Sequence, residues 1–302
     1  MAKTLKKYAT VQLGGWQLGC LRIGGAGLGN ILFPWARAKI FSKENDATFL
    51  PPPWASLKIG PWLRNESDKR NYGALLRTPI SSCLRRSLVE LTSLTLSEMN
   101  DSRPAAPQTK DVLYTFSGMR NKMHDIFGHH VFIRQELTNI YKGNPPLVKA
   151  EHPYIAVHVR QGDFRQATNE AEIRDGKTNT QIPDKWYASI IGRLHEANPS
   201  LPVHIYSDGN EGSLREILSL PNTKLISGGN ALTDMFGLAD SLILVASNST
   251  FSQWGSYLGQ PHTCWFPGTL RERCVDNSQI FEGEIDYEDE LPPLIINTLK
   301  SA

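Results

Sequence analysis

Polar side chains follow three apolar stretches of strand length in the second half of the chain. His158 and Arg160 end the first stretch, Ser207 and Asp208 end the second, and Ser249 follows a later one. An arginine can donate a planar pair of hydrogen bonds to a phosphate group. A helix that begins directly after a strand offers unpaired N–H groups and the positive end of its dipole to the same anion. These residue types and places predict a binding site for a phosphorylated ligand.

The segment from His158 to Phe164 reads His-Val-Arg-Gln-Gly-Asp-Phe. Alternation along a strand puts His158 and Arg160 on one face, so that both side chains point into the same crevice. Gly162 permits a sharp turn that brings the backbone close to a ligand. The alternative is a histidine and an arginine at the edge of the core, held by a neighbouring carboxylate such as Asp163. For this segment alone, both interpretations stay open.

The other two segments also have an ordinary structural explanation. The Ser-Asp-Gly sequence at 207–209 is typical of a turn closed by an aspartate side chain. Ser249, Thr250 and Phe251 stand where a helix should begin, and serine and threonine are preferred helix caps. Three strand ends of one sheet nevertheless carry groups that can bind a phosphate or a sugar, and this convergence favours a functional site.

A glycine cluster near the N-terminus predicts a tight loop before a helix. It does not meet the G-x-G-x-x-G pattern of dinucleotide-binding oxidoreductases, because Asn30 replaces the last glycine. The acidic residues nearest the position at which such proteins bind ribose, Glu44 and Asp46, lie in a polar run typical of a loop. Gly27, Gly29 and Asn30 can instead approach a sugar or phosphate closely. A loop in which the glycines only shape a turn fits equally well.

The elements that must position these residues are clearest in the second half. Apolar runs of strand length alternate there with helical patterns, which predicts a parallel α/β sheet wrapped by helices. The predicted strands are 155–159, 203–206, 224–226 and 242–246, and the predicted helices are 184–197, 211–219 and 231–239. Ligands of such sheets bind beyond the carboxyl ends of the strands, where the polar residues lie.

The first half gives a weaker pattern. Residues 11–40 predict a strand, a tight loop and a helix, and further helices are expected at 87–99 and 119–141. The Gly-Asn-Pro-Pro sequence at 143–146 predicts a turn or linker between two domains. We therefore expect an N-terminal domain at 1–148 and a C-terminal domain at 149–302.

Composition excludes several classes of protein. A length of 302 residues suits two domains, and 40% hydrophobic with 21% charged residues is ordinary for a globular chain. The net charge of +2 lacks the cationic excess of a nucleic-acid binder. No run of about 18 consecutive apolar residues occurs, so integral membrane contact is not expected.

The predicted location is the cytoplasm. The N-terminal lysines are followed by glutamines and glycines rather than by the apolar core of a signal peptide. Cys20, Cys83, Cys264 and Cys274 are widely spaced, contain no CxxC pair and fit a reducing compartment. Peripheral association with a membrane stays open.

Taken together, these segments resemble the alpha-1,2-fucosyltransferases and, more distantly, the alpha-1,6 and protein O-fucosyltransferases. The His-x-Arg-x-Gly-Asp-aromatic segment of that family is similar to residues 158–164, and its Ser-Asp strand end to 207–208. Its Ser-Asn-Ser-Ser/Thr-Phe-Ser-x-Trp segment is similar to residues 247–254, and its Gly-Gly-x-Gly-Asn loop to 25–30.

The chain departs from the family pattern at three positions. Gln161 stands where many members have a second arginine, Ile31 stands where a glutamine usually follows the loop asparagine, and Ala26 lengthens the glycine loop. Residues 41–150 show no match. These departures leave the acceptor and its linkage open.

The resemblance implies two facing Rossmann-like domains of the GT-B type, an acceptor-side first domain and a second domain that binds the nucleotide sugar. It also implies inverting transfer of fucose from GDP-fucose to a glycan hydroxyl, with an alpha-1,2 linkage and without an essential metal or other cofactor. A different GDP-sugar transferase and a catalytically silent nucleotide-sugar binding protein stay as alternatives.

Without a metal, protein groups must neutralise the leaving diphosphate. We expect Arg160 and the helix start at Ser249, Thr250 and Phe251 to do this. No Asp-x-Asp sequence follows a predicted strand, and the acidic stretch at 282–290 is expected to be a solvated tail.

Two further roles fall to carboxylates. Asp163 is the candidate general base by position, and orientation of Arg160 is its alternative role. Asp208 or Asp234 is the candidate acceptor of the guanine ring hydrogens, with Asp234 favoured because it opens the helix before the fourth strand. The residues predicted to bind the GDP-sugar are Gly27, Gly29, Asn30, His158, Arg160, Ser207, Asp208, Asp234, Ser249, Thr250 and Phe251.

Overall fold

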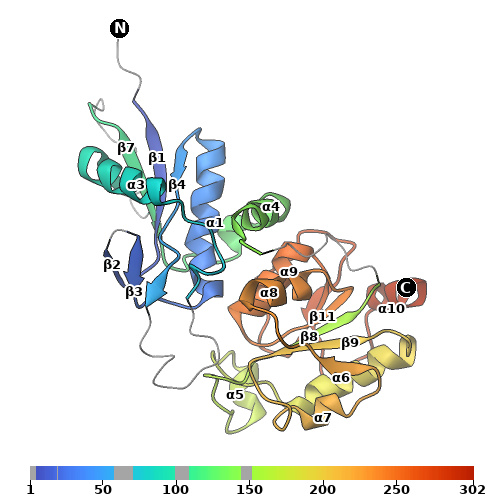
Figure 1. Cartoon of the computed structure of the whole chain (residues 1–302). Coiled ribbons are helices and arrows are strands. Elements are labelled where there is room, and N and C mark those ends of the chain that lie inside the picture. Colours follow the sequence, from blue (N-terminus) through green and yellow to red (C-terminus); the bar gives the residue numbers. More distant parts are fainter. Residues whose placement is uncertain (1–4, 19, 58–70, 99–108, 144–151) are drawn as a thin grey trace. The chain divides into compact units, whose positions relative to one another are not determined.

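The computed structural model of the chain forms two compact units, Met1–Asn144 and Pro145–Ala302 (Figure 1). It describes residues 5–18, 20–57, 71–98, 109–143 and 152–302. The turn predicted at 143–146 and the boundary predicted after residue 148 lie largely outside the described residues. Each unit is considered by itself below.

The first unit contains a four-stranded parallel sheet. Its strands are β1 (Lys7–Gln12), β4 (Thr48–Leu50), β6 (Leu94–Ser97) and β7 (Val112–Ser117), in the order β4-β1-β7-β6. Helix α1 (Leu28–Glu44) follows the glycine cluster and buries most of its apolar residues. The strand and helix predicted over 11–40 are therefore present.

A small sheet interrupts the predicted connection between strand and helix. Strands β2 (Trp16–Leu18) and β3 (Leu21–Ile23) form an antiparallel pair, and β5 (Ser56–Leu57) runs parallel to β3. The glycine cluster thus joins β3 to α1 instead of joining β1 to α1.

Two predicted helices of the first unit differ from the structure. The helix expected at 87–99 is instead α3 (Ile80–Thr92), and the chain then continues as strand β6, because Leu94–Ser97 pairs with β7. The helix expected at 119–141 is divided into a short 3-10 helix, η1 (His124–Ile126), and α4 (His130–Ile140). Gly128 lies between them with a φ of 79°, a left-handed conformation that no regular helix contains.

The second unit is built on a six-stranded parallel sheet with the order β10-β9-β8-β11-β12-β13. The strands are β8 (Ile155–Val159), β9 (Val203–Ser207), β10 (Thr223–Leu225), β11 (Ile243–Val245), β12 (His262–Trp265) and β13 (Glu282–Glu284). The chain builds outward from β8 to one edge, then returns to the other side of β8 through β11. This is the doubly wound order of a Rossmann fold, and it confirms the predicted α/β class.

Helices cover the sheet of the second unit on both faces, with α6 and α7 on one side and α8 and α9 on the other (Figure 1). They are α5 (Glu170–Arg174), α6 (Asp184–Ala197), α7 (Arg215–Leu218), α8 (Ala231–Ala239), α9 (Thr250–Gly259) and α10 (Pro293–Ser301). The bounds predicted for α6 and α8 are confirmed, whereas α7 is shorter than the helix expected at 211–219. None of the helices in the described parts of the chain has the length and hydropathy needed to cross a bilayer.

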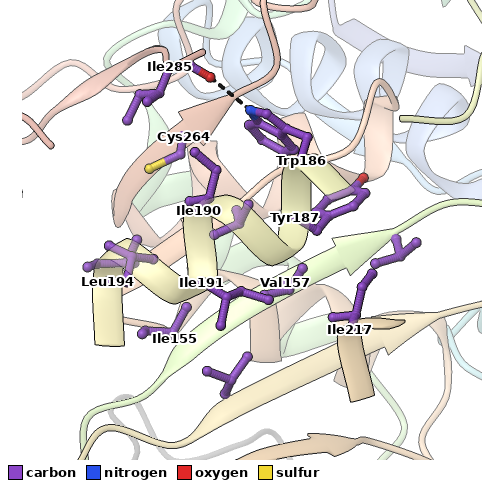
Figure 2. Packing of buried hydrophobic residues seen from close by; sticks show 14 of the residues in the cluster. Ile155, Val157, Trp186, Tyr187, Ile190, Ile191, Leu194, Ile217, Cys264 and Ile285 are labelled. Atoms are coloured by element: carbon purple, nitrogen blue, oxygen red, sulfur yellow. Dashed lines mark hydrogen bonds between the residues drawn. The ribbon is translucent and has the colours of Figure 1, made fainter. Parts of the chain in front are cut away.

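Helix α6 anchors the core of this unit. Its residues Trp186, Ile190 and Leu194 are fully buried among the side chains of β8 and its neighbours (Figure 2). The indole N–H of Trp186 donates to the carbonyl oxygen of Ile285 at 2.8 Å, so the largest side chain of the helix is also satisfied as a donor (Figure 2). Strand β8 is buried along its whole length and holds the residues that follow it in place.

The acidic stretch at 282–290 is not a solvated tail. Glu282 and Glu284 belong to β13, the edge strand, and their carboxylates accept hydrogen bonds from the backbone N–H groups of Cys274 and Gly268. These bonds tie the preceding loop to the sheet. The prediction was wrong because the charges alone were considered, not the loop donors that they bind.

Two of the four cysteines form a disulfide. Cys20, which follows β2, is bonded to Cys83 of α3, whereas Cys264 and Cys274 are buried thiols. The cysteine spacing had fitted a reducing compartment and gave no sign of this pair, because the two residues lie 63 positions apart. Disulfides of this kind are rare in reducing compartments.

Candidate functional site

The predicted site residues of the second unit lie where the strand order reverses. Strands β8 and β11 are neighbours in the sheet, yet the chain reaches β11 only after completing β9 and β10. Parallel sheets of this kind open a crevice at such a point, beyond the carboxyl ends of the strands. Arg160 follows β8, Asp208 follows β9, and α9 begins after β11. The sequence therefore placed these residues correctly at one edge.

Arg160 lies between two carboxylates. Its Nη2 is 2.6 Å from Oδ1 of Asp163 and its Nη1 is 2.7 Å from Oδ2 of Asp208. The guanidinium carbon also lies 5.5 Å from the centre of the Phe164 ring. The side chain of Arg160 is 27% exposed, so solvent or a ligand can reach it. The carboxylate contact proposed as the structural alternative for Arg160 is thus present, with Asp163 and with a second residue.

Asp208 connects the ends of β8 and β9. Besides pairing with Arg160, it accepts a hydrogen bond from the backbone N–H of Gln161 at 2.8 Å. A Cβ atom at Gly162 would lie only 2.1 Å from Oδ2 of Asp208. The glycine is therefore needed because the carboxylate occupies the space where a side chain would lie.

His158 belongs to a separate, uncharged network. Its Nδ1 lies 2.7 Å from the hydroxyl oxygen of Ser252, 3.0 Å from that of Ser247 and 3.5 Å from that of Ser249. Burial, and secondly the charge of Arg160, lower the pKa of His158 to about 3. The imidazole is therefore neutral at physiological pH and serves as a hydrogen-bonding partner of the serine hydroxyls.

The start of α9 is capped by the same serines. The hydroxyl of Ser249 accepts from the backbone N–H of Ser252, and Ser252 in turn accepts from the backbone N–H of Ser247. The ring of Phe251 lies 5.1 Å from that of His158. The N-capping alternative for this segment is present, and the helix also leaves its first N–H groups without intrahelical partners at the edge of the sheet.

The remaining predicted residues have less direct places. The hydroxyl of Ser207 donates to the carbonyl of Val159 at 2.7 Å and accepts from the N–H of Gly209, so it closes a turn. Asp234 lies in the first turn of α8. Gly27, Gly29 and Asn30 belong to the first unit, at the start of α1, and their contribution to the donor site stays a prediction.

Sequence reasoning missed the residues that hold the loop after β8. The side-chain oxygen of Gln161 accepts from the hydroxyl of Ser213 at 2.5 Å. The amide of Gln181 donates to the carbonyls of Gln161 and Phe164 at 3.0 and 2.8 Å. No periodic signal marks these contacts, because they join residues 17 to 52 positions apart.

Among the described residues, no three histidine, cysteine or acidic side chains are grouped closely enough to hold a metal ion. The positive groups near the strand ends are the Arg160 guanidinium and the start of α9. The arrangement can therefore bind an anion such as a phosphate through hydrogen bonds and positive charge.

Comparison with known proteins identifies relatives of the chain. The sequence profile of glycosyl transferase family 11 matches residues 98–267, more than half of the chain. An alpha-1,2-colitosyltransferase from Escherichia coli is 27% identical over 108 residues, which are 34% of this chain and 36% of that protein. The match thus spans only about a third of the relative.

Solved structures with a similar course of the chain include two fucosyltransferases. The NodZ alpha-1,6-fucosyltransferase co-crystallised with GDP is 14% identical, with 84% of this chain and 93% of that chain covered and a TM-score of 0.39. POFUT1 in complex with GDP is 11% identical, with 88% and 100% covered and a TM-score of 0.46. The heptosyltransferase WaaC of E. coli, solved with ADP, is 11% identical, with 97% and 98% covered and a TM-score of 0.43.

Proposed function

Because the chain belongs to glycosyl transferase family 11, we propose that it transfers fucose from GDP-fucose to a hydroxyl of a glycan. The transfer inverts the configuration at the sugar carbon, needs no metal and forms an alpha-1,2 linkage. A relative named for an alpha-1,2 linkage supports that choice. The second unit binds the donor and the first unit faces the acceptor, as in a GT-B enzyme.

The observation that carries the proposal is the position of Arg160. It follows β8 at the point where the strand order reverses, and the start of α9 lies after the neighbouring strand β11. A diphosphate placed there would meet a guanidinium and the positive end of a helix together. Few other places in the unit offer an anion both groups.

Arg160 keeps the capacity to bind a phosphate despite its two ion pairs. Those pairs engage one N–H of Nη1 and one of Nη2, whereas a guanidinium carries five N–H donors. Asp163 and Asp208 fix the plane of the guanidinium before the ligand arrives. The two carboxylates also oppose the charge of a diphosphate, and the dipole of α9 offsets part of this repulsion.

The reaction places the greatest demand on these groups as the sugar–phosphate bond breaks. Negative charge then grows on the leaving diphosphate, and Arg160 stabilises it more strongly than it stabilises the bound donor. The attacking hydroxyl loses its proton to a general base, for which Asp163 stays the candidate by position. Its ion pair with Arg160 supports the second role, that of orienting the guanidinium.

Calorimetric titration of the full chain tests the proposal. GDP is titrated in excess EDTA, and a panel of GDP-, UDP- and CMP-sugars is then compared for binding and hydrolysis. We expect GDP and GDP-fucose to bind without metal, and UDP- and CMP-sugars to bind far more weakly. Loss of all GDP binding under chelation would overturn the metal-free site. GDP binding without hydrolysis or transfer would indicate the alternative, a silent nucleotide-sugar binding protein.

A further inference from the structure

The second unit contains a cavity of about 580 Å³ beside the loop that follows β8. Its walls come from that loop, from the start of α5 and from the residues that lead into α6. A volume of this size suits a ligand of one or two sugar rings. All of the residues that line the cavity belong to the second unit, so its form does not depend on the first.

Amide and carboxylate side chains dominate the wall. Asn169 uses its carbonyl oxygen to cap α5, which leaves its NH₂ group for a ligand. Gln181 uses its NH₂ group to hold two backbone carbonyls, which leaves its carbonyl oxygen. Gln166 also lines the cavity, and its side chain has no hydrogen bond to another described residue. The wall thus offers both donors and acceptors, the combination that a sugar hydroxyl can use.

Asp184 supplies the one charged acceptor that is not held by a cation in the described parts of the chain. It is the first residue of α6, where the positive end of the helix favours a carboxylate. Burial, and secondly repulsion from Glu216, raise the pKa of Asp184. Glu170, the other acid in the wall, is already paired with Lys185 and hydrogen-bonded to Tyr287. A carboxylate with little solvent and no cation is a strong acceptor for a hydroxyl group.

The wall also has an apolar part. Ile182 and Pro183 line the cavity between Gln181 and Asp184. One face of a hexose ring carries C–H groups that pack on such side chains, while its edge hydroxyls need polar partners. Two acids and no cation in the wall disfavour a phosphate or an acidic sugar.

The cavity is continuous with the Arg160 cluster through two shared residues. Gln161 and Ser213 line the cavity and are hydrogen-bonded to each other at 2.5 Å. The backbone N–H of Gln161 also donates to Asp208, which pairs with Arg160. A ligand in the cavity would therefore lie beside a diphosphate bound at Arg160.

We infer that this cavity binds a neutral sugar ring of the glycan acceptor, with Asp184 and Gln166 as its hydroxyl partners. The inference rests on the proposed glycosyl transfer and deepens it, because it gives the second unit a part in acceptor binding as well as donor binding. It also limits the acceptor to an uncharged saccharide at this subsite.

Saturation-transfer NMR on the full chain tests the inference directly. The probes are galactose, N-acetylglucosamine, mannose and lactose, with glucuronic acid as the acidic comparison. We expect at least one neutral sugar to bind and glucuronic acid not to bind. Asp184→Asn should weaken that binding about tenfold, as expected for losing a hydrogen bond to a charged group, and Gln166→Ala should weaken it less. Gln166 is exposed, so its truncation tests the cavity without a risk to the fold.

Glu196→Gln is the matched control, because it makes the same acid-to-amide change on an exposed residue at the other end of α6. It should leave sugar binding unchanged. Absence of signal from all four neutral sugars, or binding that Asp184→Asn leaves intact, overturns the inference. Calorimetry with GDP on the same proteins separates the two ideas: sugar binding without GDP binding rejects the proposed function and keeps the cavity, whereas GDP binding without sugar binding does the reverse.

Discussion

His158 and Arg160 lie one residue apart at the end of β8, yet they belong to opposite kinds of network. His158 is buried among three serine hydroxyls and stays neutral. Arg160 is partly exposed and charged between two carboxylates. The hydroxyl network joins β8 to the start of α9, whereas the charged network joins β8 to the end of β9. One strand end thus separates a part that holds the sheet edge together from a part that is open to a ligand.

The largest effect is expected at the charged member. Arg160→Lys keeps the charge and the aliphatic stem but loses the planar fork that pairs with a diphosphate. We expect the transfer rate to fall by roughly a hundredfold or more and GDP affinity to fall less, since charge on the leaving group peaks in the transition state. The midpoint of thermal unfolding should stay near that of the wild type, because no cavity is created.

Arg165→Lys is the matched control for this experiment. Arg165 lies in the same loop and pairs with Glu172 at 2.7 Å, away from the proposed phosphate site. It should leave the transfer rate close to that of the wild type. Transfer at a similar rate by Arg160→Lys would make Arg160 a structural residue and remove the contrast between the two networks.

At the neutral member, the effect should appear in stability and should depend on pH. The pKa of His158 is about 3 in the folded chain, below its ordinary value of 6.5. Below pH 6.5 the unfolded chain binds a proton that the folded chain does not, so the free energy of unfolding falls as the pH falls towards 3. Between pH 7 and pH 5 the loss is about 2 kcal/mol.

His158→Gln should remove this contribution while keeping a polar side chain. Denaturant unfolding of both proteins at pH 7 and pH 5 measures the difference. His204 and His262, whose pKa values are also lowered, contribute equally to both proteins and cancel in the comparison. An equal pH dependence in wild type and variant would show that His158 takes up a proton without cost.

Asp163 distinguishes a positioning residue from a general base. Asp163→Asn removes the charge that faces Arg160 and should slow transfer about tenfold, the usual cost of a charge-assisted hydrogen bond. The pH profile of the rate should keep its shape. A far larger loss, together with disappearance of the acidic limb of the profile, would make Asp163 the base. Asp175→Asn, on an exposed acid of the same unit, should change neither quantity.

The smallest effect is expected at Ser249. Its hydroxyl caps α9 and contacts Ser247, so Ser249→Ala should lower the free energy of unfolding by about 1 kcal/mol. Denaturant unfolding at pH 7 measures this loss. An unchanged free energy would mean that Ser247 and Ser252 satisfy the helix start without it.

The sequence predicted the second unit better than the first, for physical reasons. Helices α6 and α8 carry regular apolar periods and β8 is a continuous apolar run, so local patterns define them. Strand β13 was missed because Glu282, Gly283 and Glu284 have no strand pattern and become a strand only by pairing with β12. Helix α3 was displaced because its serine- and leucine-rich pattern continues into β6.

For the site, the sequence predicted the residues but not their partners. Alternation put Arg160 at the sheet edge, and the strand order could then bring Asp208 to it from 48 positions along the chain. Which carboxylate bonds to which N–H depends on the backbone around Gly162, whose missing side chain makes room for Asp208. Such packing has no periodic signal.

The bond between Cys20 and Cys83 divides the first unit into a closed ring and two open ends. The ring contains β3, the glycine cluster, α1, β4 and β5, whereas β1 and β7 lie outside it. A ring of this size removes roughly 4 kcal/mol worth of disorder from the unfolded chain by the loop-entropy relation. Synthesis in a cell compartment rich in glutathione would leave the ring open, and the glycine cluster would then be held by packing alone. The folding of the first unit is therefore linked to an oxidant, while the second unit, whose two thiols are buried, folds without one.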